Sequence, residues 1–262
     1  MNEYLIADPA IRRARANEKE IAVLTFLRSE IYSSTTILAV EMGVGDRAAR
    51  NVLNRMAERG LLIKDEVKFI GGRALPLWGI TSSGVLEGLT PDEIATVNLR
   101  YHRTGSVSSV TIAHTLDVQR CRQYLHSNPE FCGWTPTRLL PAHNKKKNHP
   151  ERWAVYPDGV ISEFFNEKGV LPVAIEVERS RKTPQRYIQI IKGHLNNIEN
   201  HKYSNVYYFC TSLESAVSLQ ALFLRLMKDK DIGYWILDDG RKEKLSPEDT
   251  MGLFTFRSMG DF

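Results

Sequence analysis

The chain has 262 residues, of which 42% are hydrophobic, enough for one large or two small globular domains. Lys and Arg number 35 and Asp and Glu 31, a formal net charge of +4 that permits nucleic-acid binding without requiring it. The sequence shows no apolar run near the roughly 20 residues of a membrane span, and we expect no secretion signal. Three cysteines without Cys-x-x-Cys spacing favour free thiols, and we expect a cytoplasmic protein.

The first part of the chain contains three helix patterns followed by two strand patterns. Apolar residues recur at spacings of three and four in the helices. Gly60 ends the third helix, because glycine readily adopts the left-handed conformation that closes a helix. The predicted elements are an arm over residues 1–16, for which a helix is one alternative, a helix from Asn17, helices over residues 37–42 and 46–59, and a hairpin of strands over residues 61–70 and 73–80.

This order of elements resembles the winged helix-turn-helix family over about residues 17–89. The likeness is best at the end of the third helix, where Leu61 and Leu62 follow Gly60, and at Trp78-Gly-Ile-Thr-Ser-Ser-Gly84 after the hairpin. The resemblance implies a DNA-binding domain, which we place at residues 1–105. The alternative is a winged helix that serves protein contact or dimerisation.

The third helix carries the candidates for reading DNA bases. Its apolar side chains form one stripe, and arginine and asparagine side chains form the opposite stripe. Both types can make bidentate hydrogen bonds to base edges in the major groove, although a merely solvated polar face is the alternative. The candidate base contacts are Arg47, Arg50, Asn51 and Asn54, and the candidate phosphate contacts on the hairpin are Lys64, Lys68 and Arg73.

An unusual strand pattern in the second half contains two acids at alternate positions. Residues 170–178 are rich in β-branched and apolar side chains, and the period of two places Glu176 and Glu178 on one face. Asp158 lies in the preceding extended segment, residues 154–165, beside a proline and a glycine. Since an unpaired buried carboxylate is costly, we expect a basic side chain or a metal ion beside these acids.

The elements around these acids form an α-β-β-β-α-β series. The series resembles the PD-(D/E)xK restriction-endonuclease-like core over about residues 110–240, and it implies a nuclease-like domain at residues 106–262. The predicted fold class is therefore α/β (α+β), with a winged helix-turn-helix ahead of this core. The predicted elements are a helix over residues 112–125, strands over 134–140, 154–165 and 170–178, a helix over 184–198, a strand over 204–210, a helix over 213–229 and a strand over 232–238.

A winged helix ahead of such a core is similar to the plasmid replication-relaxation proteins, including the MOB-C class of mobilisation relaxases. That resemblance implies nicking of one strand at a plasmid transfer origin. It also implies double-stranded and single-stranded plasmid DNA, and an accessory mobilisation protein, as partners. The absence of His-x-His among the seven histidines fits a chemistry other than that of relaxases with paired metal-binding histidines. The shared residues are His114-x-Leu116, Pro157-Asp158, Glu176-x-Glu178, Arg181, Lys182 and Lys192.

Three acids are the candidate ligands of Mg²⁺ or Mn²⁺: Asp158, Glu176 and Glu178. The nuclease pattern usually has lysine two residues after the first glutamate, where this chain has Glu178. Either Glu178 is a third metal ligand or a base, or Lys182 or Lys192 supplies the positive charge from the following helix; a degenerate, inactive core is the third alternative. Tyr187 is a candidate covalent nucleophile, with aromatic packing or a phosphate contact as the alternative.

Other interpretations of the second half remain open. Glu176 and Glu178 can instead form ion pairs with Arg179, Arg181 or Lys182. The whole chain can then be a non-enzymatic DNA-binding regulator of replication or transcription with a degenerate nuclease-like domain. The basic run Lys145, Lys146 and Lys147 is either a contact to the DNA backbone or a solvated charge cluster.

Overall fold

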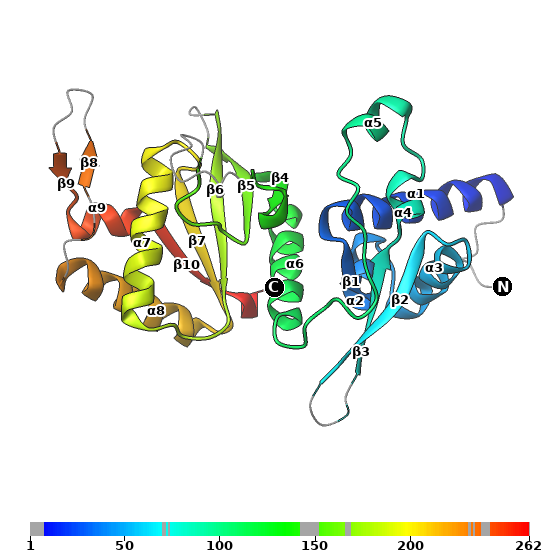
Figure 1. Ribbon diagram of the computed structural model, residues 1–262, viewed down its shortest axis with the longest axis horizontal. Coiled ribbons are helices and arrows are strands. Elements are labelled where there is room, and N and C mark those ends of the chain that lie inside the picture. The colour runs from blue at the N-terminus through cyan, green and yellow to red at the C-terminus, as the bar shows by residue number, and fades with distance from the viewer. Residues whose placement is uncertain are drawn as a thin grey trace. The chain divides into compact units, whose positions relative to one another are not determined.

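The structure is a computed structural model with mixed α/β architecture, as the sequence predicted (Figure 1). The chain divides into two compact units, Met1–Gln123 and Tyr124–Phe262, and each contains its own hydrophobic core. The boundary expected from the sequence lies near residue 105, and the two units meet inside α6 (Ile112–Ser127). The structure describes residues 8–69, 72, 74–141, 152–165, 169–229, 232, 234–236 and 242–261.

Helices and a small sheet make up the first unit. Its strands have the order β1-β3-β2, and both pairs are antiparallel. The predicted helices and hairpin are confirmed, and β1 is an additional strand that pairs with β3. The elements are α1 (Pro9–Glu30), β1 (Tyr32–Ser34), α2 (Thr35–Glu41), α3 (Asp46–Glu58), β2 (Leu62–Lys68), β3 (Ala74–Ile80), α4 (Ser82–Leu86) and α5 (Pro91–Thr96).

The first helix begins eight residues earlier than predicted, because a cap precedes it. The Asp8 carboxylate accepts a hydrogen bond from the Ala10 backbone at 2.7 Å, and Pro9 occupies the first helical position. The helical alternative for the arm is thus the one observed from Pro9 onward, where the segment supplies the first part of α1. Farther along α1, Phe26 and Leu27 are buried in the core together with Leu53 of α3.

Most of α6 is bonded to the first unit. Gln119 Nε2 donates to the Tyr32 carbonyl at 2.8 Å, and Gln123 Nε2 donates to the Ile37 carbonyl at 2.9 Å. The buried Arg122 guanidinium lies 3.0 Å from a Glu30 carboxylate oxygen. These polar contacts explain why the unit continues to Gln123.

The second unit is built on a sheet of order β10-β7-β6-β5-β4. Strands β4, β5 and β6 pair antiparallel, whereas β6, β7 and β10 pair parallel. Helices α7 and α8 cover one face (Figure 1), and their side chains share a core with those of β7 and β10. The bounds are β4 (Phe131–Pro136), β5 (Gly159–Phe165), β6 (Gly169–Glu178), α7 (Pro184–Glu199), β7 (Asn205–Cys210), α8 (Leu213–Asp229), α9 (Pro247–Gly252) and β10 (Phe254–Ser258).

Three predicted strands differ from those observed. The first is β4, after which Thr137–Leu139 forms a 3-10 turn. The second starts only at Gly159, so Asp158 immediately precedes it. The last, β8 (Tyr234–Ile236), pairs with β9 (Lys242–Lys244) and not with the main sheet. The edge position next to β7 belongs to β10, because its Phe254 and Phe256 rings pack against Tyr208 and Phe223.

Candidate functional site

The main chain holds Asp158 firmly at the start of β5. Its backbone N–H donates to the Ile175 carbonyl at 3.0 Å, and its carbonyl accepts from Thr137 at 3.1 Å. Its carboxylate Oδ2 accepts from the Val177 backbone at 2.8 Å. The next residue, Gly159, lies against Trp134, where an added Cβ would come within 2.4 Å of the indole ring. These contacts place the Asp158 carboxylate beside β6, next to the residue that follows Glu176.

The Glu176 carboxylate lies beside a buried histidine from α7. His194 Nε2 is 3.3 Å from Glu176 Oε1, and the His194 side chain is completely buried. Burial lowers the pKa of His194 to about 3, against the opposing effect of the nearby Asp158 carboxylate. His194 is therefore neutral near pH 7.

Two further side chains set the tautomer of His194. Asn197 Nδ2 donates to the Tyr203 hydroxyl oxygen at 2.9 Å, and this hydroxyl lies 2.7 Å from His194 Nδ1. Burial raises the pKa of Tyr203, so the hydroxyl stays protonated. It can then donate a hydrogen bond to His194 Nδ1. The imidazole proton is then on Nε2, which lies 3.3 Å from Glu176 Oε1 without hydrogen-bond geometry to any described residue.

Glu178 is buried and has a cation as its partner. Lys182 Nζ lies 2.5 Å from Glu178 Oε2, so the ion pair with Lys182 considered from the sequence is present. The other oxygen, Glu178 Oε1, is buried and accepts no hydrogen bond from the described residues. Tyr208, on the neighbouring strand β7, pairs with Glu176 of β6. Burial raises the pKa of Tyr208 well above its ordinary value, and the Glu176 and Glu178 carboxylates raise it further.

The other candidates on α7 lie in different environments. Tyr187 is fully buried, and its hydroxyl accepts from the Lys182 backbone N–H at 3.1 Å. Burial raises the pKa of Tyr187, although the bond from Lys182 opposes this effect. Lys192 is exposed, two residues from the buried His194 and therefore on the opposite side of the helix. Lys182 is thus the lysine that the structure brings to the acids.

The donor set matches the chemistry of a hard divalent cation. Asp158 and Glu176 provide carboxylates from adjacent strand positions, and Glu178 Oε1 is an acceptor without a donor among the described residues. Within that part of the chain, no three His, Cys, Asp or Glu side chains form a group that could hold a metal ion.

The polar stripe of α3 is exposed along its whole length. Ala49, Val52, Leu53 and Met56 are buried, whereas Arg47, Arg50, Asn51 and Asn54 are exposed. Arg50 lies 3.9 Å from Asp46, both in solvent. On β2, Lys64 and Lys68 are also exposed; Lys64 lies 5.9 Å from the centre of the Trp78 ring.

Some predicted residues lie outside the described part of the chain. These are Arg73 on the hairpin and the basic run Lys145, Lys146 and Lys147. His114, part of the motif that suggested the relaxase resemblance, lies in α6 within the first unit.

Sequence reasoning missed His194 as a neighbour of the acids. Its only signal was its position on the buried stripe of α7, three residues before Asn197. A histidine and an asparagine at that spacing face the same way, but nothing in the sequence reveals that this direction is toward Glu176.

Comparisons with protein families, with curated proteins and with solved structures found no match. Within the described residues, no helix combines the length and the apolar character needed to cross a membrane.

Proposed function

We propose that the protein is a divalent-cation-dependent endonuclease that nicks one strand of plasmid DNA at a transfer origin. The observation that carries this proposal is the bond from Val177 N–H to Asp158 Oδ2, which brings the Asp158 carboxylate beside Glu176. Lys182, four residues after Glu178, supplies the positive charge that a nuclease site of this kind needs.

The order of elements supports the same proposal. Strands β4, β5 and β6 are antiparallel, and helix α7 and the parallel strand β7 come after them along the chain. This order is compatible with the series proposed for a restriction-endonuclease-like core. In the first unit, the helices and the β2–β3 hairpin fit a winged helix whose α3 presents arginine and asparagine to the major groove.

Each residue of the site has a separate role in the proposed phosphodiester cleavage. Asp158, Glu176 and Glu178 would hold the cation, which when bound activates water and neutralises charge on the phosphate. The neutral, buried His194 packs against the Glu176 carboxylate. Lys182, which pairs with Glu178, would supply the ammonium group that offsets negative charge on the phosphate. Tyr187 holds the loop that carries Lys182 through its bond to the backbone.

A second candidate function is supported by the partners of the acids. Glu178 is neutralised by Lys182, and the buried His194 contacts Glu176, so both glutamates have partners inside the fold. This pattern suits a DNA-binding regulator of replication or transcription in which the acids serve structure alone.

The deciding experiment measures nicking of supercoiled plasmid carrying a transfer origin, with and without Mn²⁺. We expect Asp158→Asn, Glu176→Gln and Glu178→Gln each to lower the nicking rate at least about 100-fold, because each removes a charged ligand. Glu214→Gln, an exposed acid on α8, is the matched control and should nick like the wild type.

A melting experiment separates the two candidates. Mn²⁺ at saturation should raise the melting temperature of the wild type and not that of Glu176→Gln, since a ligand of the folded state stabilises it. No nicking by the wild type and no stabilisation by Mn²⁺ would favour the regulator.

A further inference from the structure

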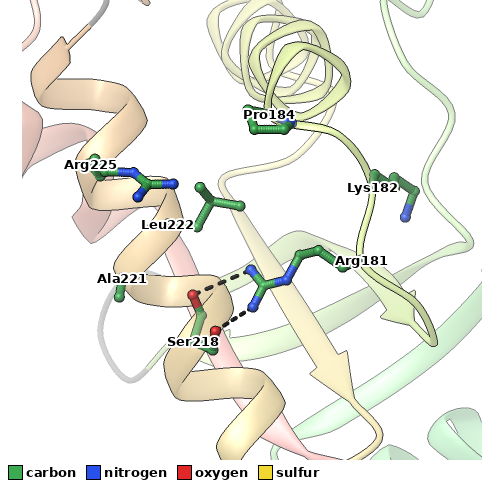
Figure 2. Close-up of a pocket in the computed structure, with 7 residues that line it drawn as sticks. All are labelled: Arg181, Lys182, Pro184, Ser218, Ala221, Leu222 and Arg225. Atoms are coloured by element: carbon green, nitrogen blue, oxygen red, sulfur yellow. Dashed lines mark hydrogen bonds between the residues drawn. The ribbon is translucent and has the colours of Figure 1, made fainter.

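A cavity of about 530 Å³ lies between the loop after β6, the start of α7 and one face of α8 (Figure 2). Basic side chains of Arg181, Lys182 and Arg225 line it, together with an apolar wall of Pro184, Ala221 and Leu222. None of the described residues that line it is acidic. A volume of this size suits a small organic ligand, and the cation excess favours an anionic one.

Arg181 is fixed in position before any ligand arrives. Its Nη2 donates to the Ser218 hydroxyl at 2.5 Å, and its Nη1 donates to the Ser218 carbonyl at 3.3 Å. Figure 2 shows the guanidinium reaching from the loop to α8. Because a guanidinium has five N–H donors in one plane, these two bonds leave donors for a phosphate.

Arg225 supplies the second cation, two turns farther along α8. It is exposed, lies beside Leu222 (Figure 2) and forms no ion pair with the described residues. The third cation, Lys182, already has the Glu178 carboxylate as its partner. The two guanidinium groups therefore carry the uncompensated positive charge of the cavity, and a phosphate suits their forked geometry.

The apolar wall indicates what is attached to the phosphate. Pro184, Ala221 and Leu222 offer a surface that inorganic phosphate would leave uncovered, whereas a nucleotide base would pack on it. Arg181 also lines a smaller cavity of about 80 Å³, of which Glu178 forms another wall. The larger cavity therefore adjoins the acidic site. Most residues that line the larger cavity are exposed, so a DNA strand can pass through this cavity.

We propose that this cavity binds one nucleotide of a single DNA strand, with its phosphate on Arg181 and Arg225 and its base on Pro184 and Leu222. The inference rests on the proposed function, because it places the nicked strand beside the acids. A free nucleotide offers the same chemistry, and the experiment distinguishes the two sources.

The experiment measures binding of the full-length protein to a fluorescent thymidine oligonucleotide by anisotropy over a series of salt concentrations. Arg225→Gln and Arg181→Gln should each raise Kd about tenfold and reduce the slope of log K against log salt by about 0.7, as expected when one single-strand phosphate contact is lost. Lys228→Gln removes the same charge from α8 outside the cavity and should bind like the wild type. Thymidine monophosphate should compete only at concentrations far above those of the oligonucleotide.

Each contrary result has a defined meaning. Unchanged affinity and salt slope in Arg225→Gln, an exposed position whose change leaves the fold intact, would overturn the inference. If thymidine monophosphate competes at concentrations as low as those at which the oligonucleotide binds, the inference would also be overturned, and the cavity would be a site for a free nucleotide. If the wild type does not nick plasmid but Arg225→Gln loses strand binding, the cavity assignment holds and the nicking proposal fails. If the wild type nicks plasmid while Arg181→Gln and Arg225→Gln bind the oligonucleotide and nick normally, the nicking proposal holds and the cavity assignment fails.

Discussion

His194 contributes no positive charge to the candidate site near neutral pH. A protonated histidine would cancel the negative charge of Glu176, but burial lowers the pKa of His194 to about 3. The neutral ring lies 3.3 Å from the carboxylate through Nε2, without hydrogen-bond geometry among the described residues, and brings no positive charge to it.

Stability should fall in mild acid because of His194. The unfolded chain binds a proton on this side chain near pH 6.5, whereas the folded protein does so only near pH 3. The contribution is fully present above about pH 6.5 and is lost progressively as the pH falls toward about 3, by up to roughly 5 kcal/mol. Urea unfolding at pH values between about 7.5 and 4.5 measures this slope.

Two variants isolate the effect of His194. His194→Gln should start less stable at neutral pH but lose less stability on acidification. His201→Asn is the control, because His201 is exposed and its φ of 54° suits asparagine. An acid slope in His194→Gln equal to that of the wild type would assign the titration to another group.

At the scale of single elements, α3 is the feature most directly open to test. Its core-facing stripe is fully buried, so its arginines and asparagines can change without loss of packing. Arg50→Ala should weaken specific duplex binding by about 1–3 kcal/mol if it contacts a base. Gel-shift titration with a specific and a random duplex measures the difference.

The control for α3 is a charge removed far away in the chain. Lys228→Ala takes one positive charge from α8 and should leave specific binding within about twofold of the wild type. Equal loss of affinity for specific and random duplexes in Arg50→Ala would instead make Arg50 a phosphate contact.

The elements that the sequence predicted well are those with a clear period. The alternation of Glu176 and Glu178 with apolar residues predicted their shared face of β6, and the stripe of Ala49 and Leu53 predicted the buried side of α3. Pairing between distant segments was not predictable from local pattern. The contact of His194 with Glu176 depends on where α7 packs on the sheet.

The edge strand illustrates the same limit. Residues 232–238 and 254–258 are both short and apolar, and local sequence gives no reason to prefer one beside β7. The choice follows from the Phe254 and Phe256 side chains, which complete an aromatic cluster around Tyr208 and Phe223. That cluster exists only after the sheet and α8 have assembled.

At the scale of the whole molecule, the two cores are the main feature. One includes Leu53 and Trp78, and the other includes Phe223 and Tyr208. Phe223→Ala should destabilise the second unit by about 3–5 kcal/mol, because it leaves a cavity in a fully buried aromatic cluster.

Amide hydrogen exchange would locate the effect of Phe223→Ala. We expect faster exchange in β7 and α8 and unchanged protection in α3, with duplex affinity retained. Leu53→Ala should give the mirror-image result. A uniform loss of protection across both units in either variant would show that they unfold as one.

The position of β10 also governs the order in which the chain can fold during synthesis. Strand β7 needs a partner about 50 residues farther along, and the Val206 N–H bonds to the Leu253 carbonyl at 2.9 Å. Until the ribosome has released that segment, the nascent second unit exposes one unpaired edge of β7, whose other edge pairs with β6. The first unit does not depend on a strand from the C-terminal segment, so it can fold while translation continues. Chaperones should therefore engage the nascent chain mainly in the interval between the appearance of β7 and that of β10.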